Sequence, residues 1–165
     1  MSNRIGWISV LAALIVGTSC APSTPVIKVE PSASSLQVNH LARVTVIVEN
    51  IVDLTAFEVH LSFDPDTLEV VELNNGGFIT PDFILQDTFD NDAGTIDYAI
   101  AQIDRPSANG NGTLFEIVFR AKAEGNSLIN FRETPAASMG ALFSDDNGTE
   151  LRVSLMNGRM DVHDS

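Results

Sequence analysis

The chain has 165 residues, 44% of them hydrophobic, which fits one globular domain with a sizeable core and argues against disorder. Its formal net charge is −13, from 22 acidic and 9 basic residues. Binding to nucleic acid or to an anionic membrane surface needs clustered Lys and Arg, so this charge argues against both as partners. The acidity serves either solubility or a functional acidic surface.

The first twenty residues differ from the rest. Arg4 gives a positive start, residues 5–16 are almost wholly apolar, and three small residues precede Cys20, the only cysteine. A membrane-spanning helix needs about 20 apolar residues, so this shorter run fits an export signal better. The small residues before the cysteine resemble a bacterial lipobox, and we expect residues 1–20 to be a signal peptide with Cys20 as the lipidation site. Simple cleavage and secretion is the first alternative, and an uncleaved anchor the second.

Residues 21–25 (APSTP) are expected to form a linker, residues 26–162 one β-sandwich domain, and residues 163–165 a tail. The domain is predicted to be all-β, because short apolar runs alternate with turn-forming residues roughly every 8–12 positions. No helical period persists, although residues 80–82 could start a single helical turn. The clearest predicted strands are 26–29, 42–49, 56–63, 68–72, 95–101, 113–121, 127–131, 151–155 and 159–162. Short strands are also predicted around Phe89 and at 141–143.

The stretch 56–72 (AFEVHLSFDPDTLEVVE) has the strongest pattern. Alternation with a period of two predicts a strand with one buried face. The buried side chains are predicted to be Phe57, Val59, Leu61 and Phe63, and the solvent-facing ones Glu58, His60 and Ser62. The Asp-Pro sequence that follows predicts a tight turn into a second strand, because proline fixes φ and aspartate can bond the backbone ahead of it.

The run LSFDPDTLEVV (residues 61–71) resembles the strand–turn–strand segment of cohesins, the scaffoldin modules that bind dockerin modules in cellulosomes. NGTLFEIVFRAKAEG (111–125) and NGRMDV (157–162) extend the similarity over about residues 26–162. The resemblance implies about nine strands in a jelly-roll β-sandwich. It also implies a non-catalytic module that binds a dockerin-bearing protein outside the cell or at its surface, linked to polysaccharide breakdown, with calcium carried by the dockerin. A carbohydrate-binding module of the same fold group is the alternative, and an enzyme is a distant third.

The resemblance further implies a flat recognition face made by strand 56–63 and its sheet neighbours. Alignment through the F-D-P sequence places Glu58 where type I cohesins tend to carry an acidic partner-binding residue, and Ala56 where they often carry Asn. If strands 95–101 and 113–121 belong to the same sheet, their outer residues complete one surface with an apolar centre and a mostly acidic rim. The partner-binding candidates are Glu58, His60, Ser62, Asp97, Ala99, Phe115, Val118 and Arg120.

Phe115 and Val118 break the strict alternation of strand 113–121. The pattern fits a β-bulge, an outer face covered by a loop, or an exposed apolar patch for a protein partner. The sequence does not separate these three interpretations.

No other motif indicates a site. His40, His60 and His163 have no second ligand at zinc spacing and are expected on the surface, so no metal or cofactor is predicted. The acidic segments 90–94 and 145–148 are predicted to be hairpin turns rather than calcium loops. Familiar catalytic motifs are missing, and the aromatic platform of a sugar site is poorly supported, since Trp7 lies in the leader and Tyr98 faces inward.

Overall fold

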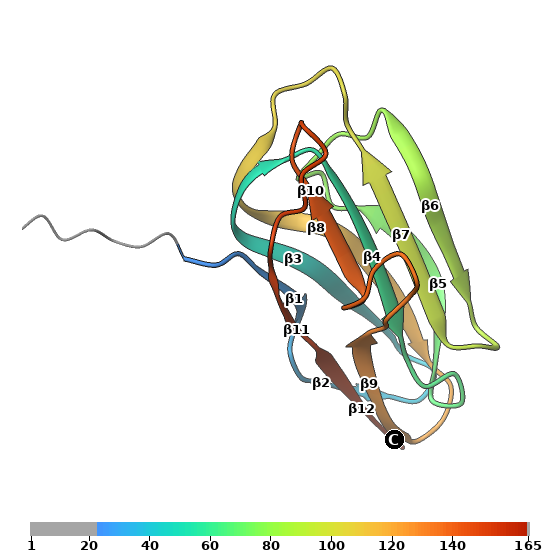
Figure 1. Cartoon of the computed structure of the whole chain (residues 1–165). Helices are drawn as coiled ribbons and strands as arrows, with labels where there is room; N and C mark the ends of the chain where they lie inside the picture. Colours follow the sequence, from blue (N-terminus) through green and yellow to red (C-terminus); the bar gives the residue numbers. More distant parts are fainter. Residues whose placement is uncertain (1–22, 165) are drawn as a thin grey trace, which may run out of the picture.

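The computed structural model describes residues 23–164, which form two packed β-sheets (Figure 1). The all-β prediction is confirmed, with twelve strands in place of about nine. Within this range no helix is long and apolar enough to cross a membrane. The single helical turn considered at residues 80–82 does not form. The expected leader, with Cys20, lies outside the described residues.

The first sheet has five strands in the order β11-β1-β3-β8-β5. Its strands are β1 Val26–Glu30, β3 Leu41–Leu54, β5 Leu68–Asn75, β8 Ala108–Ala121 and β11 Ser154–Met156. The second sheet has seven strands in the order β2-β12-β9-β4-β7-β6, with β10 beside β4. Its strands are β2 Ser34–Gln37, β4 Ala56–Ser62, β6 Phe83–Asp90, β7 Thr95–Ala101, β9 Gly125–Phe131, β10 Ala141–Ser144 and β12 Gly158–His163.

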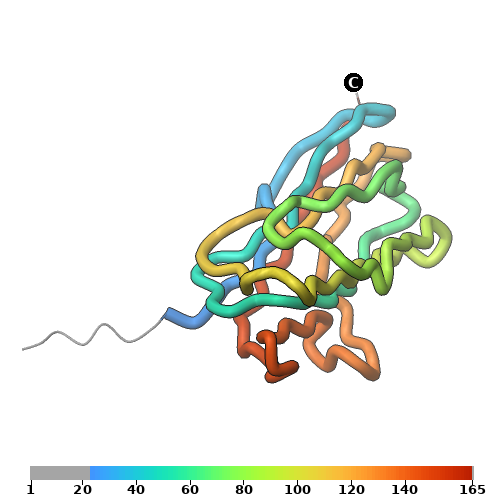
Figure 2. Tube along the Cα trace, turned by 90° about the horizontal axis from the view of Figure 1, so that it is seen from above, coloured from blue at the N-terminus to red at the C-terminus, as the bar shows by residue number. Residues whose placement is uncertain are grey.

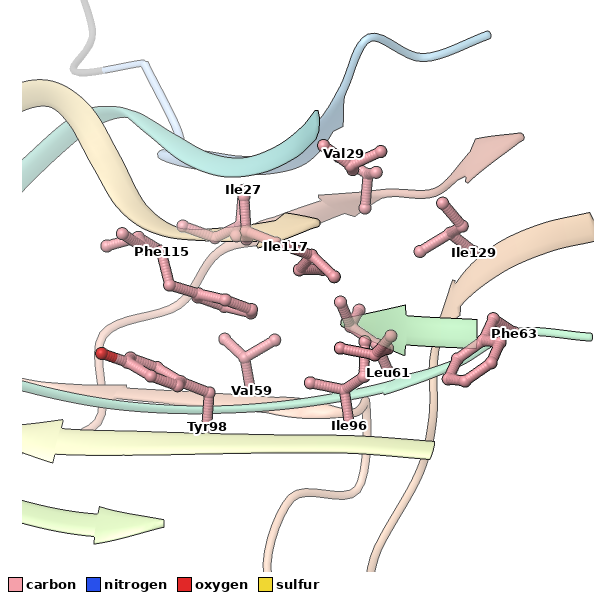
Figure 3. Close-up of a cluster of buried hydrophobic side chains, with 14 of the residues drawn as sticks. Ile27, Val29, Val59, Leu61, Phe63, Ile96, Tyr98, Phe115, Ile117 and Ile129 are labelled. Atoms are coloured by element: carbon pink, nitrogen blue, oxygen red, sulfur yellow. The ribbon is translucent and has the colours of Figure 1, made fainter. Parts of the chain in front are cut away.

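Period-two alternation decides which side chains fill the space between the sheets. Phe57 of β4 is buried, so the predicted inward register is confirmed together with Val59, Leu61 and Phe63, which is just beyond the strand. Figure 3 shows the last three within the core. The residues that β3 and β7 turn inward, among them Val46 and Tyr98, are buried as well. A run of stacked rings crosses the core: Phe143 to Phe57 at 6.0 Å, Phe57 to Tyr98 at 6.1 Å, and Tyr98 to Phe115 at 4.6 Å between centroids.

The predicted Asp-Pro turn forms after β4, and it carries the chain from one sheet to the other. Asp64 holds it: its carbonyl accepts the N–H of Leu68 at 2.9 Å, and its carboxylate accepts the Asp66 N–H at 3.0 Å and the Thr67 hydroxyl at 2.8 Å. The next strand, β5, pairs with β8 in the opposite sheet rather than with β4. The conspicuous motif of the sequence is therefore a connection between the two layers.

The register of β4 predicts unequal effects at neighbouring positions. Leu61→Ala should lower the free energy of unfolding by about 2–5 kcal/mol, because Leu61 is fully buried and the change leaves a cavity. Ser62→Ala, on the other side of the strand, should change it by less than about 0.5 kcal/mol. Urea titration followed by circular dichroism measures both. Equal effects would mean that the register is wrong.

Candidate functional site

The side of the seven-stranded sheet that faces away from the core is formed largely by β4, β7 and β6. β7 lies between the other two and pairs antiparallel with both. Residues directly opposite one another in such pairs point to the same face. We call this surface the outer face; it carries Glu58, His60 and Ser62 of β4, Thr95, Asp97 and Ala99 of β7, and Phe83, Gln86 and Thr88 of β6.

A charged network occupies the β4–β7 part of the outer face. His60 and Asp97 are directly opposite one another, and His60 Nδ1 lies 2.5 Å from Asp97 Oδ1. The other ring nitrogen, Nε2, lies 2.5 Å from Glu58 Oε1. Arg132 follows β9 and donates from Nη2 to the same Asp97 oxygen at 2.5 Å. Four side chains from three segments are thus joined through one imidazole and one carboxylate.

His60 points outward as predicted, but the expectation that it faces solvent is wrong. Its side chain is only 5% exposed, whereas those of Glu58 and Asp97 are about a quarter exposed. The bonded side chains of Glu58, Asp97 and Arg132 surround the ring, so an outward residue becomes a buried one. Ala99 is also buried, because its short side chain lies between the cross-strand neighbours Glu58 and Gln86.

Strand β8 does not contribute to the outer face, so the single surface expected for Phe115, Val118 and Arg120 does not exist. β8 lies in the five-stranded sheet, between β3 and β5. A register shift in its pairing with β3 falls at Leu114, and this irregularity lets Leu114 and Phe115 both be buried. Phe115 is core, as the bulge interpretation allowed. Val118 and Arg120 lie on the far side of the other sheet, where Arg120 donates to Glu69 at 2.7 Å.

Strand β6, Phe83–Asp90, is the feature that the sequence analysis underestimated, because only a short strand around Phe89 was predicted. It is the edge strand of its sheet, and all eight of its residues are exposed. Ile84 and Phe89 are paired with the core residues Ile100 and Ile96, yet they remain open to solvent because β6 is the last strand of its layer. Leu85, at a register shift, is 68% exposed. Of the exposed apolar side chains of β6, only Phe83, paired with Ala101, is assigned by register to the outer face. The apolar area therefore lies along the edge strand, beside a charged centre, which reverses the expected arrangement.

Comparison with known proteins decides the family. The family model of the cohesin domain matches residues 27–162.

The chain belongs to the cohesin family.

A search of curated proteins gives no match to this cohesin. Among solved structures, it is similar to a type II cohesin domain from the cellulosome of Acetivibrio cellulolyticus, at 19% identity and a TM-score of 0.73 over 84% of this chain and 95% of that one. A type I cohesin–dockerin complex from Clostridium thermocellum matches at 17% identity and a TM-score of 0.71, over 86% of this chain and 100% of that one. A non-cellulosomal cohesin from the archaeon Archaeoglobus fulgidus matches at 21% identity and a TM-score of 0.66, over 86% of this chain and 92% of that one. At these identities the likeness shows the fold.

The two acidic segments of this cohesin are turns, as predicted, and their carboxylates bond the backbone. The N–H groups of Ala93 and Asp92 donate to Asp90, which lowers the pKa of that carboxyl. The N–H groups of Thr149 and Asn147 do the same for Asp145 and likewise lower its pKa. Within residues 23–164, no group of three or more His, Cys, Asp or Glu side chains is arranged to hold a metal ion.

Proposed function

We propose that this cohesin is a non-catalytic recognition module that binds a dockerin-bearing protein through its outer face. The observation that carries the proposal is the composition of that face and its edge: a fixed charged network next to the edge strand β6, on which Phe83 is exposed on the outer face and Ile84 and Leu85 are exposed along the edge. Exposed apolar groups that lie together commonly mark protein interaction sites. Charged groups beside them select the partner and speed the encounter. The dockerin complexes formed by structurally similar cohesins are consistent with this function.

The same composition supports a protein partner over a polysaccharide. Sugar-binding β-sandwiches present flat aromatic rings to the ligand, but Tyr98, the only tyrosine, is buried against Phe115. On β6, Phe83 and Phe89 are paired with residues of opposite faces of β7, so their rings do not form one flat platform. A link to polysaccharide breakdown would then come through the bound protein.

We also propose that the protein is exported and held at the cell surface by a lipid on Cys20. Between Cys20 and β1, which begins at Val26, lie five residues that can span at most about 18 Å. The wild-type protein should therefore partition into detergent, and Cys20→Ser should move it to the soluble fraction. A soluble wild type with a cleaved and unmodified N-terminus would contradict the anchor and leave export alone.

The experiment that tests recognition is a pull-down from the native culture supernatant, with the cohesin as bait, in calcium and again in chelator. Dockerins of this family fold around calcium, so capture of one dockerin-bearing protein in calcium only is the expected result. Retention of the purified cohesin on insoluble polysaccharide, without any captured protein, would instead support direct carbohydrate binding. Equal capture in calcium and in chelator would argue against a dockerin as the partner.

A further inference from the structure

The sequence contains several Asn-Gly pairs, and the structure holds them in different ways. They begin at Asn75, Asn109, Asn111, Asn147 and Asn157. In such a pair the backbone nitrogen of the glycine can attack the side-chain carbonyl carbon of the asparagine, because glycine has no Cβ to hinder the approach and its backbone rotates freely. Each pair therefore undergoes deamidation unless the fold prevents it.

The reaction needs no reagent other than water. The glycine nitrogen forms a bond to Cγ of the asparagine, the Cγ–Nδ2 bond breaks, and the displaced nitrogen leaves as ammonia with the proton of the glycine N–H. The product is a cyclic succinimide. Water then adds to one of its two carbonyl carbons and opens the ring, which gives aspartate or, through the other C–N bond, isoaspartate.

Four of the asparagine side chains are fixed by their carbonyl oxygen. In each case Oδ1 accepts a backbone N–H: Gly77 to Asn75 at 2.7 Å, Asp53 to Asn109 at 3.0 Å, Asn50 to Asn111 at 2.7 Å and Phe131 to Asn157 at 3.0 Å. The glycines that follow are held too, by the bond from Gly76 N–H to the Leu114 carbonyl at 2.9 Å or by strand pairing of β8 and β12. At these four pairs the reacting atoms meet only after a strand or a tertiary contact opens.

The pair Asn147-Gly148 is different. Both residues are exposed in the hairpin turn that follows β10. Among residues 23–164, no N–H donates to Asn147 Oδ1, and its amide nitrogen donates only to the adjacent Asp146 at 2.6 Å. Gly148 has a φ of +75°, no atom lies within 4 Å of where its Cβ would be, and its N–H donates to the Asp145 carbonyl at 3.1 Å. Ring closure here has room and must break only bonds local to the turn.

We propose that Asn147 is a site of covalent modification in this cohesin, where deamidation produces aspartate and isoaspartate. The inference does not depend on dockerin binding. Either product adds a negative charge to a turn that already carries Asp145 and Asp146. Isoaspartate also adds one carbon to the main chain between Asp145 and Thr149, whose backbones are bonded at 3.0 Å, so the turn closes less well after the reaction.

The test follows the folded wild-type protein during storage in mildly alkaline buffer, with tryptic peptides analysed by mass spectrometry. Residues 133–152 form a peptide in which Asn147 is the only asparagine, and residues 153–159 form one in which Asn157 is the only asparagine. Each bond that must open should slow the reaction about two- to tenfold, so Asn147 should convert at least about tenfold faster than Asn157. In guanidinium chloride, where the fold is lost, the two sites should convert at similar rates.

The product is identified by methyl transfer from S-adenosylmethionine with isoaspartyl methyltransferase. The folded wild type should become a methyl acceptor on storage, and Asn147→Gln should not, because glutamine closes the larger ring much more slowly. Asn126→Gln is the matched control, since Asn126 is exposed but precedes a serine, and it should behave like the wild type.

A change at Asp145 should have the opposite effect. Its carboxylate accepts the N–H of Asn147 at 2.9 Å and of Thr149 at 2.7 Å, which holds the turn. Asp145→Ala removes both bonds and should accelerate conversion of Asn147 about two- to tenfold for each. Circular dichroism checks that the variant is folded, and the comparison of Asn147 with Asn157 in the wild type does not depend on it.

Three results would overturn the proposal. They are equal conversion of Asn147 and Asn157 in the folded protein, an unmodified Asn147 after a time in which the unfolded chain has reacted, and methyl transfer that persists in Asn147→Gln. An unchanged rate in folded Asp145→Ala would overturn the view that the bonds of the turn limit the reaction. Dockerin capture is not a readout in any of these measurements, so the proposed function stands or fails separately.

Discussion

Phe115→Asp should leave the protein unfolded at room temperature. Phe115 has no exposed surface, and its ring stacks on Tyr98 at 4.6 Å between centroids. Loss of a buried Phe side chain costs about 3–5 kcal/mol, and an unpaired carboxylate in the same place adds a desolvation cost of several kcal/mol. The sum approaches the whole stability of an ordinary domain, about 5–15 kcal/mol. Circular dichroism and the absence of a cooperative urea transition measure the result.

Val118→Asp is the matched control for this change. Val118 is half-buried on the far side of the same strand, and its direct cross-strand partner on β3 is Arg43. An aspartate there can stay hydrated, and its attraction to Arg43 on β3 is offset by repulsion from Glu72, its direct partner on β5. We therefore expect a loss of no more than about 1 kcal/mol. A folded Phe115→Asp protein would contradict the burial of Phe115. So would an equal loss of unfolding free energy in the Phe115→Asp and Val118→Asp proteins.

Replacement of both Phe83 and Leu85 by Asp should abolish dockerin capture while the domain stays folded. Both side chains are more than half exposed on the edge strand β6, so neither change removes core packing. Loss of an apolar anchor residue of a protein interface costs about 2 kcal/mol or more, and every 1.4 kcal/mol weakens binding about tenfold. The pull-down in calcium and the urea midpoint of the same protein are the two measurements.

Leu41→Asp controls for the loss of an exposed apolar side chain in general. Leu41 is 56% exposed on β3, in the sheet that does not carry the outer face. The Leu41→Asp change should leave both dockerin capture and the free energy of unfolding nearly unchanged. If the Phe83 and Leu85 variant still captures its partner, the recognition surface lies elsewhere on the domain.

The features that follow from local chemistry could be predicted from the sequence. The alternation in β4 placed Phe57, Val59 and Leu61 in the core, because a strand turns successive side chains to opposite faces. The Asp-Pro turn was also predictable, since the oxygens of Asp64 accept hydrogen bonds from groups two to four residues away. The cohesin family could be recognised because its motif spans this same local unit.

The features that depend on long-range pairing could not be predicted in this way. No local pattern says that β8 joins β3 and β5 rather than β4, and the expected position of Phe115 depended on that choice. His60 was assigned to solvent from its register, but its burial comes from Asp97 and Arg132, which are 37 and 72 positions further along the chain. β6 was obscured because a register shift at Leu85 breaks its alternation, although Pro81 just before an aromatic and β-branched run is typical of an edge strand.

The arrangement of the strands separates β6, at the edge of the outer face, from the first and last strands of the described domain. β1 lies near one end of its sheet, and β12, the last strand, is packed behind it, since Gly158 leaves a gap that Val29 fills. β12 also runs beside β2, so the last strand of the domain lies close to its first two strands (Figure 2). β6 is at the opposite end of the stack (Figure 1). The domain can therefore be fused, lengthened or immobilised through either terminus, on a longer polypeptide or on a sensor surface, with β6 still pointing away from the attachment point.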